Sequence, residues 1–411
     1  MLVIGGGAAG MLAALIGARQ GATVTILERN EKLGKKLYIT GKGRCNITNS
    51  CPKEDFFKNV TNNPRFIMSA LNTFSSEDTI NLFEQLRVPL VIERGNRVFP
   101  SSNKSSDIIN ALLRELVREG VEVKYSTRVK SIYKDGNEFV VITDNGAYRS
   151  MTVVLATGGV TYKATGSTGD GYEFAKTFGH SIVPLKGSLI GVITDNTSAL
   201  SGLTLKNVGV TAVLNDKCIA SEFGELLFTH IGLSGPTILS LSSLINRFAT
   251  DNLYIKIDLK PALDNLALDK RVLRDFTANV NKKLVNSLDE LLPKSLIAEV
   301  IKQSGLSGDI VVNQMTKEQR TALIDTLKGL KYKIKAFDDI NNAIITSGGI
   351  CVKEINPKTM ESKLVKGLYF AGEIIDVDAF TGGFNLQIAL STGYVAGESA
   401  AYAENTNEVE L

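Results

Sequence analysis

A glycine-rich turn directly after the first apolar segment constrains the fold of this chain more than any other feature. Met1–Ile4 is apolar throughout and predicts a buried strand, and the six residues after it are Gly-Gly-Gly-Ala-Ala-Gly. Gly5, Gly7 and Gly10 therefore form G-x-G-x-x-G, and the apolar residues that follow have helical spacing. This order of strand, glycines and helix is typical of a Rossmann-type dinucleotide-binding unit.

The residue types in this turn match the needs of a bound dinucleotide. Gly5 allows a tight turn, Gly7 lets the backbone approach a pyrophosphate, and Gly10 lets the helix pack on the strand. The free N–H groups at the helix start face the phosphates. A second strand, Thr23–Leu27, is followed by Glu28, whose carboxylate can accept hydrogen bonds from two ribose hydroxyls. That arrangement favours FAD or NAD over NADP.

Three further segments favour FAD over NAD. Gly34–Asn49 is a second loop rich in glycine and basic residues, suited to a long dinucleotide. The apolar run Val153–Gly159 ends in Ala-Thr-Gly-Gly, as the returning strand of a flavin domain does, and a later apolar strand delivers Glu373. A glycine pair then precedes a helix that we expect to continue to about Tyr402. Its N–H groups would stabilise negative charge on a reduced flavin ring.

The two halves of this nucleotide site lie at opposite ends of the chain, so the middle must be an insertion. The sequence predicts an α/β fold in which a Rossmann-type FAD-binding domain, built from both chain ends, is interrupted by an inserted domain of a β-barrel plus helices. We place the first part of the FAD-binding domain at residues 1–185, the insertion at 186–340 and the second part at 341–411. We expect an acidic, frayed tail at Asn405–Leu411.

Local patterns predict the other elements. A helix at Asp107–Arg118 precedes three alternating segments that we interpret as a small antiparallel meander: Val121–Tyr125, Val129–Tyr133 and Phe139–Thr143. In the insertion we expect strands at Leu189–Thr194, Val208–Leu214, Lys217–Ala220, Leu226–Thr229 and Leu253–Leu259, with a hairpin turn at Asn215-Asp216. Helices are expected from Ser234-Gly235-Pro236 to about Phe248, at Leu268–Ser287, at Lys294–Gln303 and at Lys317–Lys328.

The chain resembles a family of bacterial flavoproteins known as NAD(FAD)-utilising dehydrogenases, which includes aminoacetone oxidase and a bile-acid-inducible flavoprotein reductase. The matching motifs run from end to end: Gly5–Gly10, Leu37–Asn49, Ala156–Gly159, Thr165–Tyr172, Phe228–Pro236 and Ala371–Gly393. One departure is Ala379-Phe380, where the family pattern has a small turn residue. The resemblance implies a non-covalent FAD, with NAD(P)H as a transient electron donor.

The resemblance also implies which residues contact FAD. The glycine loop would line the pyrophosphate, Glu28 the adenosine ribose and the backbone of Val129 the adenine. The ribityl chain and the flavin ring would lie against the residues from Gly372 onward. The full set is Gly5, Gly7, Ala8, Ala9, Gly10, Glu28, Arg29, Lys36, Thr40, Gly41, Gly43, Arg44, Cys45, Asn46, Val129, Ala156, Thr157, Gly158, Gly372, Glu373, Asp376, Gly383, Asn385, Leu386 and Ile388.

Composition limits the other function classes. The 46 Lys and Arg residues against 43 Asp and Glu leave a net charge of +3, which gives no reason to expect nucleic acid as a partner. Basic clusters exist at Lys32–Lys36 and Lys328–Lys335. The first belongs to the expected FAD loop, and the second is short and has no interleaved aromatic residue beyond Tyr332. Four cysteines without C-x-x-C and only two histidines argue against a metal site and favour a cytoplasmic location. No apolar run is long enough for a membrane span.

No residue can be assigned confidently as a catalytic acid or base. Tyr162 follows the Ala-Thr-Gly-Gly strand and is a candidate for substrate contact. His230 is a candidate proton donor, although a buried histidine that caps its turn is the simpler interpretation. We expect His180 to be a helix-capping or surface residue and Asp170 to be structural.

The sequence therefore predicts an FAD-dependent oxidoreductase that acts on a small organic substrate. The leading hypothesis is an NAD(P)H-dependent reductase of unsaturated, enone-type compounds of the steroid or bile-acid kind. Alternatives are an amine oxidase of the aminoacetone type that uses oxygen, and, from another class, an RNA-modifying flavoprotein. A non-enzymatic electron carrier is a further alternative, and the oligomeric state is left open.

Overall fold

The computed structural model describes the backbone of residues 1–409 and the side chains of residues 1–406. The chain forms two compact units. Unit 1 combines Met1–Gly187 with the segment that begins at Ala343, and unit 2 is Ser188–Asn342. Each unit has its own cluster of buried apolar residues, so each has a separate hydrophobic core.

A five-stranded parallel sheet forms the centre of unit 1. Its strand order is β20-β11-β1-β2-β7, and every neighbouring pair is parallel. The strands are β1 (Leu2–Ile4), β2 (Thr25–Leu27), β7 (Glu122–Lys124), β11 (Val153–Leu155) and β20 (Leu368–Phe370). The first two and the last of these come from opposite ends of the chain, so the α/β class and the Rossmann-type sheet built from both ends are confirmed.

One strand of the expected meander belongs elsewhere. Val121–Tyr125 was predicted to pair with the segments that follow it, but β7 lies parallel to β2 at the edge of the main sheet. The antiparallel meander instead consists of β8 (Val129–Asp135), β9 (Glu138–Thr143) and β10 (Gly146–Ser150). Alternation alone cannot distinguish the two partners, because an edge strand of a parallel sheet also has one polar side.

Helices cover the sheet and smaller sheets flank it. The helices of unit 1 are α1 (Ala8–Arg19), α2 (Lys35–Ile39), α3 (Lys53–Lys58), α4 (Met68–Thr73), α5 (Ser76–Gln85), α6 (Ser105–Arg118), α7 (Asp170–Thr177) and α12 (Phe384–Val409). The small sheets are β3 (Thr48–Asn49) with β6 (Arg97–Pro100) and β5 (Leu90–Glu93), β4 (Val60–Asn62) with β21 (Asp378–Ala379), and β12 (Ile182–Ser188) with β19 (Ile345–Ile350).

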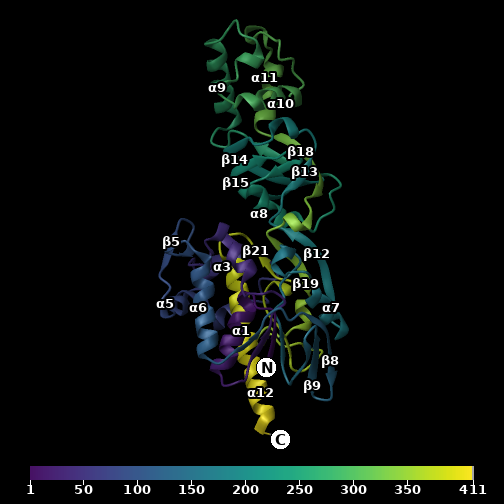
Figure 1. Ribbon diagram of the computed structural model, residues 1–411. Helices are drawn as coiled ribbons and strands as arrows, with labels where there is room; N and C mark the ends of the chain where they lie inside the picture. Colours follow the sequence, from purple (N-terminus) through teal and green to yellow (C-terminus); the bar gives the residue numbers. More distant parts are fainter. Residues whose placement is uncertain (410–411) are drawn as a thin grey trace. The chain divides into compact units, whose positions relative to one another are not determined.

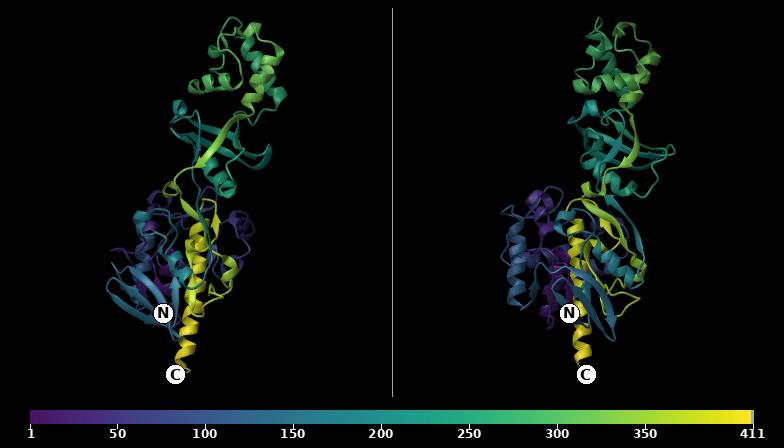
Figure 2. Two further views of the ribbon diagram at one scale, coloured as in Figure 1. Left: turned by 90° about the vertical axis from the view of Figure 1, so that its right-hand side faces the viewer. Right: turned by 45° about the vertical axis from the view of Figure 1, so that its right-hand side comes forward.

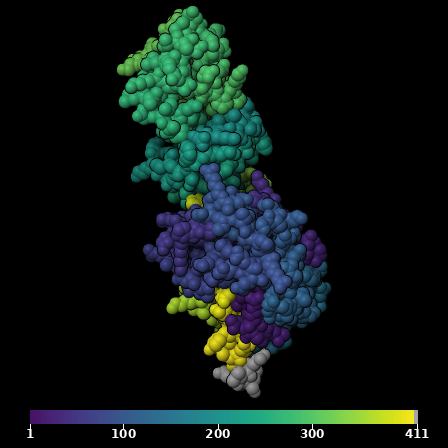
Figure 3. Space-filling view, turned by 90° about the vertical axis from the view of Figure 1, so that its left-hand side faces the viewer, coloured from purple at the N-terminus to yellow at the C-terminus, as the bar shows by residue number. Residues whose placement is uncertain are grey.

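Helices α1 and α12 pack side by side through the middle of unit 1 (Figures 1 and 2). The segment that carries α3 to α6, in dark blue, covers one face of the unit (Figure 3). Helix α12 continues past Tyr402 to Val409, so the helix is longer than expected and includes the first residues of the expected acidic tail. The rest of that expected tail, residues 410–411, lies outside the described residues.

Unit 2 contains a closed six-stranded barrel with the order β13-β16-β15-β14-β17-β18. The strands are β13 (Val192–Thr194), β14 (Thr204–Leu214), β15 (Lys217–Phe228), β16 (Gly232–Ser234), β17 (Leu253–Asp258) and β18 (Leu330–Phe337). The predicted barrel is thus confirmed, and Asn215 and Asp216 form the β14–β15 hairpin turn with φ of 49° and 63°. The two short strands expected at Lys217–Ala220 and Leu226–Thr229 are one long strand, β15.

The helices of unit 2 are α8 (Pro236–Ile245), α9 (Asn265–Thr277), α10 (Lys294–Gln303) and α11 (Lys317–Leu327). The last three gather at one end of the barrel (Figure 1). The helix expected at Leu268–Ser287 ends at Thr277, and the chain continues through a turn to Leu284–Asn286.

The expectation for His180 is confirmed in part, whereas that for His230 is wrong. His180 caps the end of α7 through its backbone N–H, which donates to the Ala175 carbonyl oxygen at 3.1 Å, but it is 3% exposed and not on the surface. Its Nδ1 donates to the Glu354 carboxylate at 3.1 Å, and its Nε2 accepts from the Ser362 hydroxyl at 2.8 Å, because a carboxylate can only accept. His230, expected to be buried, is exposed, and Thr229 makes the hydrogen bonds that close its turn.

The buried His180 predicts an acid-sensitive step in stability. Burial lowers the pKa of His180, although Glu354 acts in the opposite direction. The unfolded chain therefore binds more protons than the folded chain below about pH 6.5, and stability is lost as pH falls below that value. Between pH 7 and 5.5 the free energy of unfolding should fall by up to about 1.4 kcal/mol per pH unit from this group.

The measurement is chemical denaturation across that pH range for the parent, His180→Gln and the exposed control His230→Gln. His180→Gln should have a flatter pH profile, whereas His230→Gln should keep the parental slope. An unchanged slope in His180→Gln would contradict the assignment.

Candidate functional site

The glycine loop between β1 and α1 combines tight packing with one open position. A Cβ on Gly10 would lie 1.9 Å from the Gly5 carbonyl oxygen, so a side chain there cannot be accommodated. A Cβ on Gly7 would meet no atom within 4 Å, although Gly7 caps the N-terminus of α1. The loop therefore presents bare backbone and open space at a helix N-terminus, which is the environment a pyrophosphate requires.

Glu28, at the end of β2, holds this loop in place. Its Oε2 accepts from the Gly6 N–H at 2.7 Å, and its Oε1 accepts from the Asn30 N–H at 2.8 Å. The Asn30 amide also bonds to Oε1 and to the Thr165 carbonyl oxygen at 3.0 Å. The carboxylate, 6% exposed, thus lies at the loop, where a ribose-binding acid is expected.

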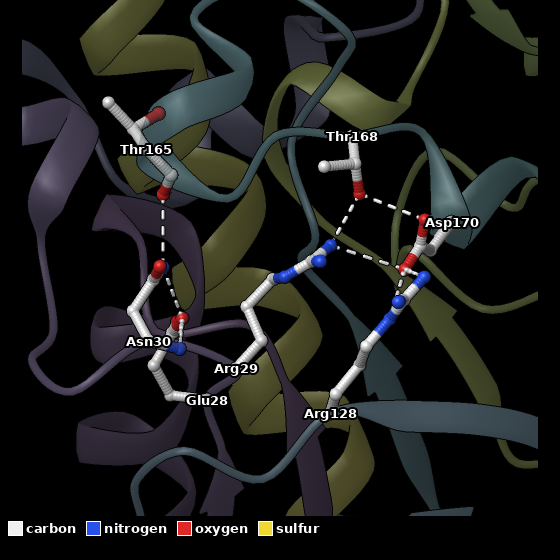
Figure 4. A network of polar contacts seen from close by, with 7 residues as sticks. All are labelled: Glu28, Arg29, Asn30, Arg128, Thr165, Thr168 and Asp170. Carbon is white, nitrogen blue, oxygen red and sulfur yellow. Dashed lines mark hydrogen bonds and ion pairs between the residues drawn. The ribbon is translucent and has the colours of Figure 1, made fainter.

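Two arginines converge on Asp170 beside this end of the site (Figure 4). Arg29 donates to the Thr168 hydroxyl at 2.5 Å and to Asp170 at 3.2 Å. Arg128 donates to the same carboxylate at 3.0 Å. The network ties the end of β2 to the start of α7. Arg29 was predicted to contact FAD, and its guanidinium here bonds to protein groups.

A lysine–glutamate pair links the second loop to the final strand of the sheet. Lys36 Nζ lies 2.5 Å from Glu373 Oε2 and donates to the Thr161 hydroxyl at 2.9 Å. Glu373 Oε1 accepts from the Thr346 N–H at 2.9 Å. Burial by itself would raise the pKa of Glu373, but Lys36 and Thr346 hold that pKa below its usual value. Lys36 also lies 5.7 Å from the centre of the Tyr162 ring.

Arg44 and Cys45, both predicted to line FAD, have different surroundings. The Arg44 guanidinium forms an ion pair with Glu93 and donates to the Asn103 side chain at 2.6 Å. Its central carbon lies 4.2 Å from the centre of the Phe99 ring. It is therefore held by the β5–β6 hairpin. Cys45 is fully buried, and burial raises the pKa of its thiol to about 12. A thiol with that pKa is a poor nucleophile at neutral pH.

Asp376 and Asn385 brace the loops of the C-terminal part. Both Asp376 carboxylate oxygens accept amide hydrogen bonds, from Asn62 at 2.7 Å and from Asn63 at 3.0 Å. Asn385 accepts from the Ala379 N–H at 2.9 Å and donates to the Ala379 carbonyl oxygen at 2.7 Å. The turn that departs from the family pattern, Ala379-Phe380, is therefore held by the first turn of α12.

Several polar residues at this end were not singled out from the sequence. Asn49 donates to the carbonyl oxygens of Gly95 and Gly382, at 3.0 and 2.9 Å, which joins the β5–β6 hairpin to the turn before α12. The buried Gln387 accepts from the Thr48 hydroxyl at 2.6 Å. Both lie inside the matching motifs, and a polar residue at an apolar helix position is the signal that could have identified Gln387.

The other predicted contacts also belong to unit 1. Thr40, Gly41, Gly43 and Asn46 lie in the loop after α2, Val129 begins β8, and Ala156, Thr157 and Gly158 directly follow β11. Ala8 and Ala9 begin α1, and Gly372 lies shortly after β20. Gly383 directly precedes α12, and Leu386 and Ile388 lie in its first turns. Of the two catalytic candidates, Tyr162 lies in unit 1, whereas His230 is an exposed residue of unit 2.

These residues fit a bound FAD. Thr157 Oγ1 and Asn46 Oδ1 are buried polar atoms without a hydrogen-bond partner. Leaving such an atom unpaired costs about 1–3 kcal/mol, which a ligand with donors and acceptors would recover. A Cβ on Gly43 would also meet no atom within 4 Å, as on Gly7. Open backbone and unpaired polar atoms thus occur in the glycine loop, in the loop after α2 and in the segment after β11, where a long dinucleotide is expected.

Two other types of site are absent from the part of the chain that the structure describes. No group of three or more His, Cys, Asp or Glu residues is placed to hold a metal ion. No described helix combines the length and apolar character needed to cross a membrane.

Known proteins match nearly the full length of this chain. The protein-family model described as HI0933-like protein Rossmann domain matches residues 1–399. The 3-dehydro-bile acid delta(4,6)-reductase of Clostridium scindens is 30% identical over 408 residues, covering 97% of this chain and 98% of its own length. The ribosomal RNA dihydrouridine synthase of Haemophilus influenzae is 30% identical over 406 residues, covering 97% of each chain.

A solved structure has the same fold. The 3-ketosteroid delta1-dehydrogenase of Sterolibacterium denitrificans, in complex with 1,4-androstadiene-3,17-dione, superposes with a TM-score of 0.51 and 11% identity. The match covers 98% of this chain and 99% of that chain. At this identity the likeness concerns the fold alone.

Two glycine substitutions should separate cofactor binding from folding. Gly7 has an extended backbone, with φ of −79° and ψ of −170°, and open space beside it. Gly7→Ala should therefore leave the stability of the FAD-free protein within about 0.5 kcal/mol of the parent. The added methyl group would occupy the pyrophosphate position and weaken FAD binding by at least about 30-fold, or about 2 kcal/mol.

Gly10→Ala is the matched control, because its Cβ meets backbone and not a ligand. It should lower the stability of the FAD-free protein by more than about 1 kcal/mol. FAD titration by fluorescence and thermal unfolding of FAD-free protein measure the two effects. Parental FAD affinity in Gly7→Ala would exclude this loop as the pyrophosphate site.

Proposed function

The chain belongs to the family of HI0933-like proteins with a Rossmann domain and is an FAD-dependent oxidoreductase; we propose that it reduces a carbon–carbon double bond conjugated to a carbonyl group. One observation carries this proposal. Two relatives whose names describe unlike substrates each match 97% of this chain, and the two substrates share that group.

The shared group follows from the chemistry of the two names. A 3-dehydro bile acid with double bonds at positions 4 and 6 is a conjugated dienone. A uridine ring has a double bond next to a ring carbonyl, and dihydrouridine results from adding two hydrogen atoms across that bond. Each reduction can be written as addition of a hydride to a double-bond carbon remote from the carbonyl and of a proton to the other carbon of that bond. The shared acceptor group favours the same step here.

We assign the chain's own residues to holding the cofactor. The Gly5–Gly10 loop takes the pyrophosphate, and Glu28 takes the adenosine ribose. The unpaired Thr157 hydroxyl and Asn46 amide oxygen offer further hydrogen bonds. The N-terminus of α12 favours a negatively charged partner, and Lys36 is held in place by its ion pair with Glu373. When bound, FAD supplies the two-electron hydride carrier.

The electron donor in this proposal is NADH or NADPH. The sequence has no second G-x-G-x-x-G followed by a strand and an acid, so the nicotinamide would bind transiently and leave before the substrate enters. An amine oxidase of the aminoacetone type would instead take electrons from the substrate and pass them to oxygen. Both reactions would use the same cofactor site. They differ in the electron donor, which is a nicotinamide in the reductase and the amine substrate in the oxidase.

The proton in this proposal comes from Tyr162. Its side chain is 38% exposed, and its ring lies beside Lys36, which pairs with Glu373. The hydroxyl is therefore at the edge of the candidate site and open to a substrate. His230 is a weaker candidate, since it belongs to unit 2 and its side chain makes no hydrogen bond or ion pair with the other described residues.

A second candidate function is reduction of a uracil ring within RNA. The specific observation in its favour is the match to the Haemophilus influenzae ribosomal RNA dihydrouridine synthase over 97% of both chains. It uses the same hydride and proton addition, so it differs from the first candidate only in the molecule that carries the double bond.

Anaerobic reduction experiments should identify the donor and the acceptor. The purified protein should be yellow and should release FAD on denaturation, and NADH or NADPH should bleach its visible absorbance within seconds. Addition of a steroid dienone or of deproteinised ribosomal RNA should restore the absorbance, and mass spectrometry should find a product heavier by two hydrogen atoms.

Failure of both nicotinamides, together with peroxide formation from small amines in air, would replace the reductase by the oxidase. If a nicotinamide bleaches the flavin but neither acceptor reoxidises it, the proposed substrate class is wrong and the proposed electron donor stands.

Removal of the Tyr162 hydroxyl should slow the substrate half-reaction selectively. Positioned general acids contribute about 10²–10⁴-fold to rate, so Tyr162→Phe should lower the rate of substrate reduction by at least about 100-fold. The rate of reduction by NAD(P)H should change less than threefold, because that step needs no proton from the protein. Stopped-flow absorbance measures both half-reactions. Equal losses in both would indicate a structural role for Tyr162.

A further inference from the structure

The outer side of strands β17 and β18 carries a set of lysines that the barrel core does not use. In β18, Leu330, Tyr332 and Ile334 are at most 3% exposed and fill the barrel, while Lys331 and Lys333 are exposed. Strand β17 has the same alternation, with Lys256 exposed between buried isoleucines. We call Lys256, Lys331 and Lys333, with Tyr254, the lysine face.

The strand register places like charges opposite one another. Lys256 is paired with Lys331 and Tyr254 with Lys333 in the antiparallel β17–β18 ladder. Directly opposite side chains on one face have Cβ atoms about 4.5–5.5 Å apart, and like charges at such positions destabilise a sheet. A neutral or acidic residue at either position would remove this cost. The barrel therefore has an unfavourable arrangement that its own fold does not require.

No carboxylate of the described residues offsets this charge. Lys256, Lys331 and Lys333 make no ion pair among those residues, whereas Lys335 pairs with Asp195 at 2.5 Å and Lys328 with Asp258 at 2.6 Å. The next residue across the sheet from Lys256 is Thr211, whose hydroxyl bonds to that of Ser221 at 2.9 Å. The row that contains Lys331 and Lys256 thus continues in neutral hydroxyls.

The side chain of Lys256 packs against Gly329, in the turn before β18. A Cβ on Gly329 would lie 2.2 Å from Lys256 Cε, so the lysine stem passes close to the backbone of the turn before β18. The stem packs where only glycine leaves room, and the Lys256 ammonium lies beside Gly329, on the side of the turn where the Asp325 carbonyl oxygen also lies. Tyr254 is partly buried beside Lys333 and adds an aromatic group to the same surface.

We propose that the lysine face binds the sugar–phosphate backbone of a structured RNA. This inference rests on the second candidate function and names the surface that would hold such a substrate. Repeated phosphates match cations fixed about 7 Å apart along a strand and about 5 Å apart across it. Membrane-binding surfaces also place apolar side chains among their cations. Thr211 and Ser221 continue the row of Lys256, whereas Val213 and the exposed Phe223 lie on the same side of the barrel. Binding of anionic vesicles is therefore one arm of the test.

The test compares two sets of lysine substitutions in the full-length protein. The face variant is Lys256→Gln/Lys331→Gln/Lys333→Gln. The control variant, Lys206→Gln/Lys217→Gln/Lys302→Gln, removes the same charge from exposed positions of unit 2 outside the lysine face. Thermal unfolding should agree among the three proteins within about 2 °C, which shows that the barrel is intact.

Binding of deproteinised ribosomal RNA is measured from 50 to 200 mM salt. The face variant should bind at least tenfold more weakly than the parent at 50 mM salt. Its plot of log affinity against log salt should be shallower by about 2, since each lost phosphate contact removes about 0.7–0.9 from the slope. The control variant should stay within twofold of the parent.

Three outcomes would overturn the proposal: no RNA binding by the parent at 50 mM salt, equal losses in both variants, or binding of phosphatidylglycerol vesicles with none of RNA. Reduction of a small dienone by NAD(P)H is measured on the same three proteins. It should be equal in all of them, and its absence from all would defeat the dienone candidate alone, leaving the RNA-binding result to decide the surface.

Discussion

Direct backbone contact between α1 and α12 positions both halves of the candidate site. A Cβ on Gly393 would lie 2.4 Å from the Ala9 carbonyl oxygen, and a Cβ on Gly397 would lie 2.2 Å from that of Ala13. The two glycines are four residues apart and so face the same way on α12. Because they have no side chains, the two helices touch along their backbones, closer than helices with ordinary side chains allow.

This contact controls the geometry of the loops at the ends of the two helices. Helix α1 begins at the glycine loop, and Thr392 of α12 accepts the Gly372 N–H through its hydroxyl at 2.9 Å. The chain ends are joined as well: the Met1 ammonium pairs with Glu404 at 3.2 Å, and Glu404 also accepts from the Thr152 hydroxyl. A wider helix pair would move Gly372 and Glu373 away from the loop that Lys36 belongs to, so the site depends on two glycines outside it.

Local sequence patterns predicted where the helices and strands lie better than they predicted which distant segments pair or pack with them. The glycine loop, β1 and the acid after β2 follow from spacing within about 30 residues, and the structure has them in that order. The destination of Val121–Tyr125 depends on β2, and the burial of His180 depends on Glu354 and Ser362. Neither partner is near in sequence. Gly393 and Gly397 gave no local signal either, because a glycine within a helix is unfavourable unless another backbone approaches it.

The lysine-rich segment before Phe337 shows that the net charge of a chain and the charge of one surface are different properties. A net charge of +3 over 411 residues averages over both sides of every strand. Alternation separates the same residues in space: every second residue of β18 enters the core, so Tyr332, the only aromatic inside the cluster, is buried, and the lysines share one face. The charge on one side of a sheet comes from alternate residues of each strand and from the strand paired with it. Lys256 lies 75 residues before Lys331 in the sequence, so a count over neighbouring residues does not bring the two together.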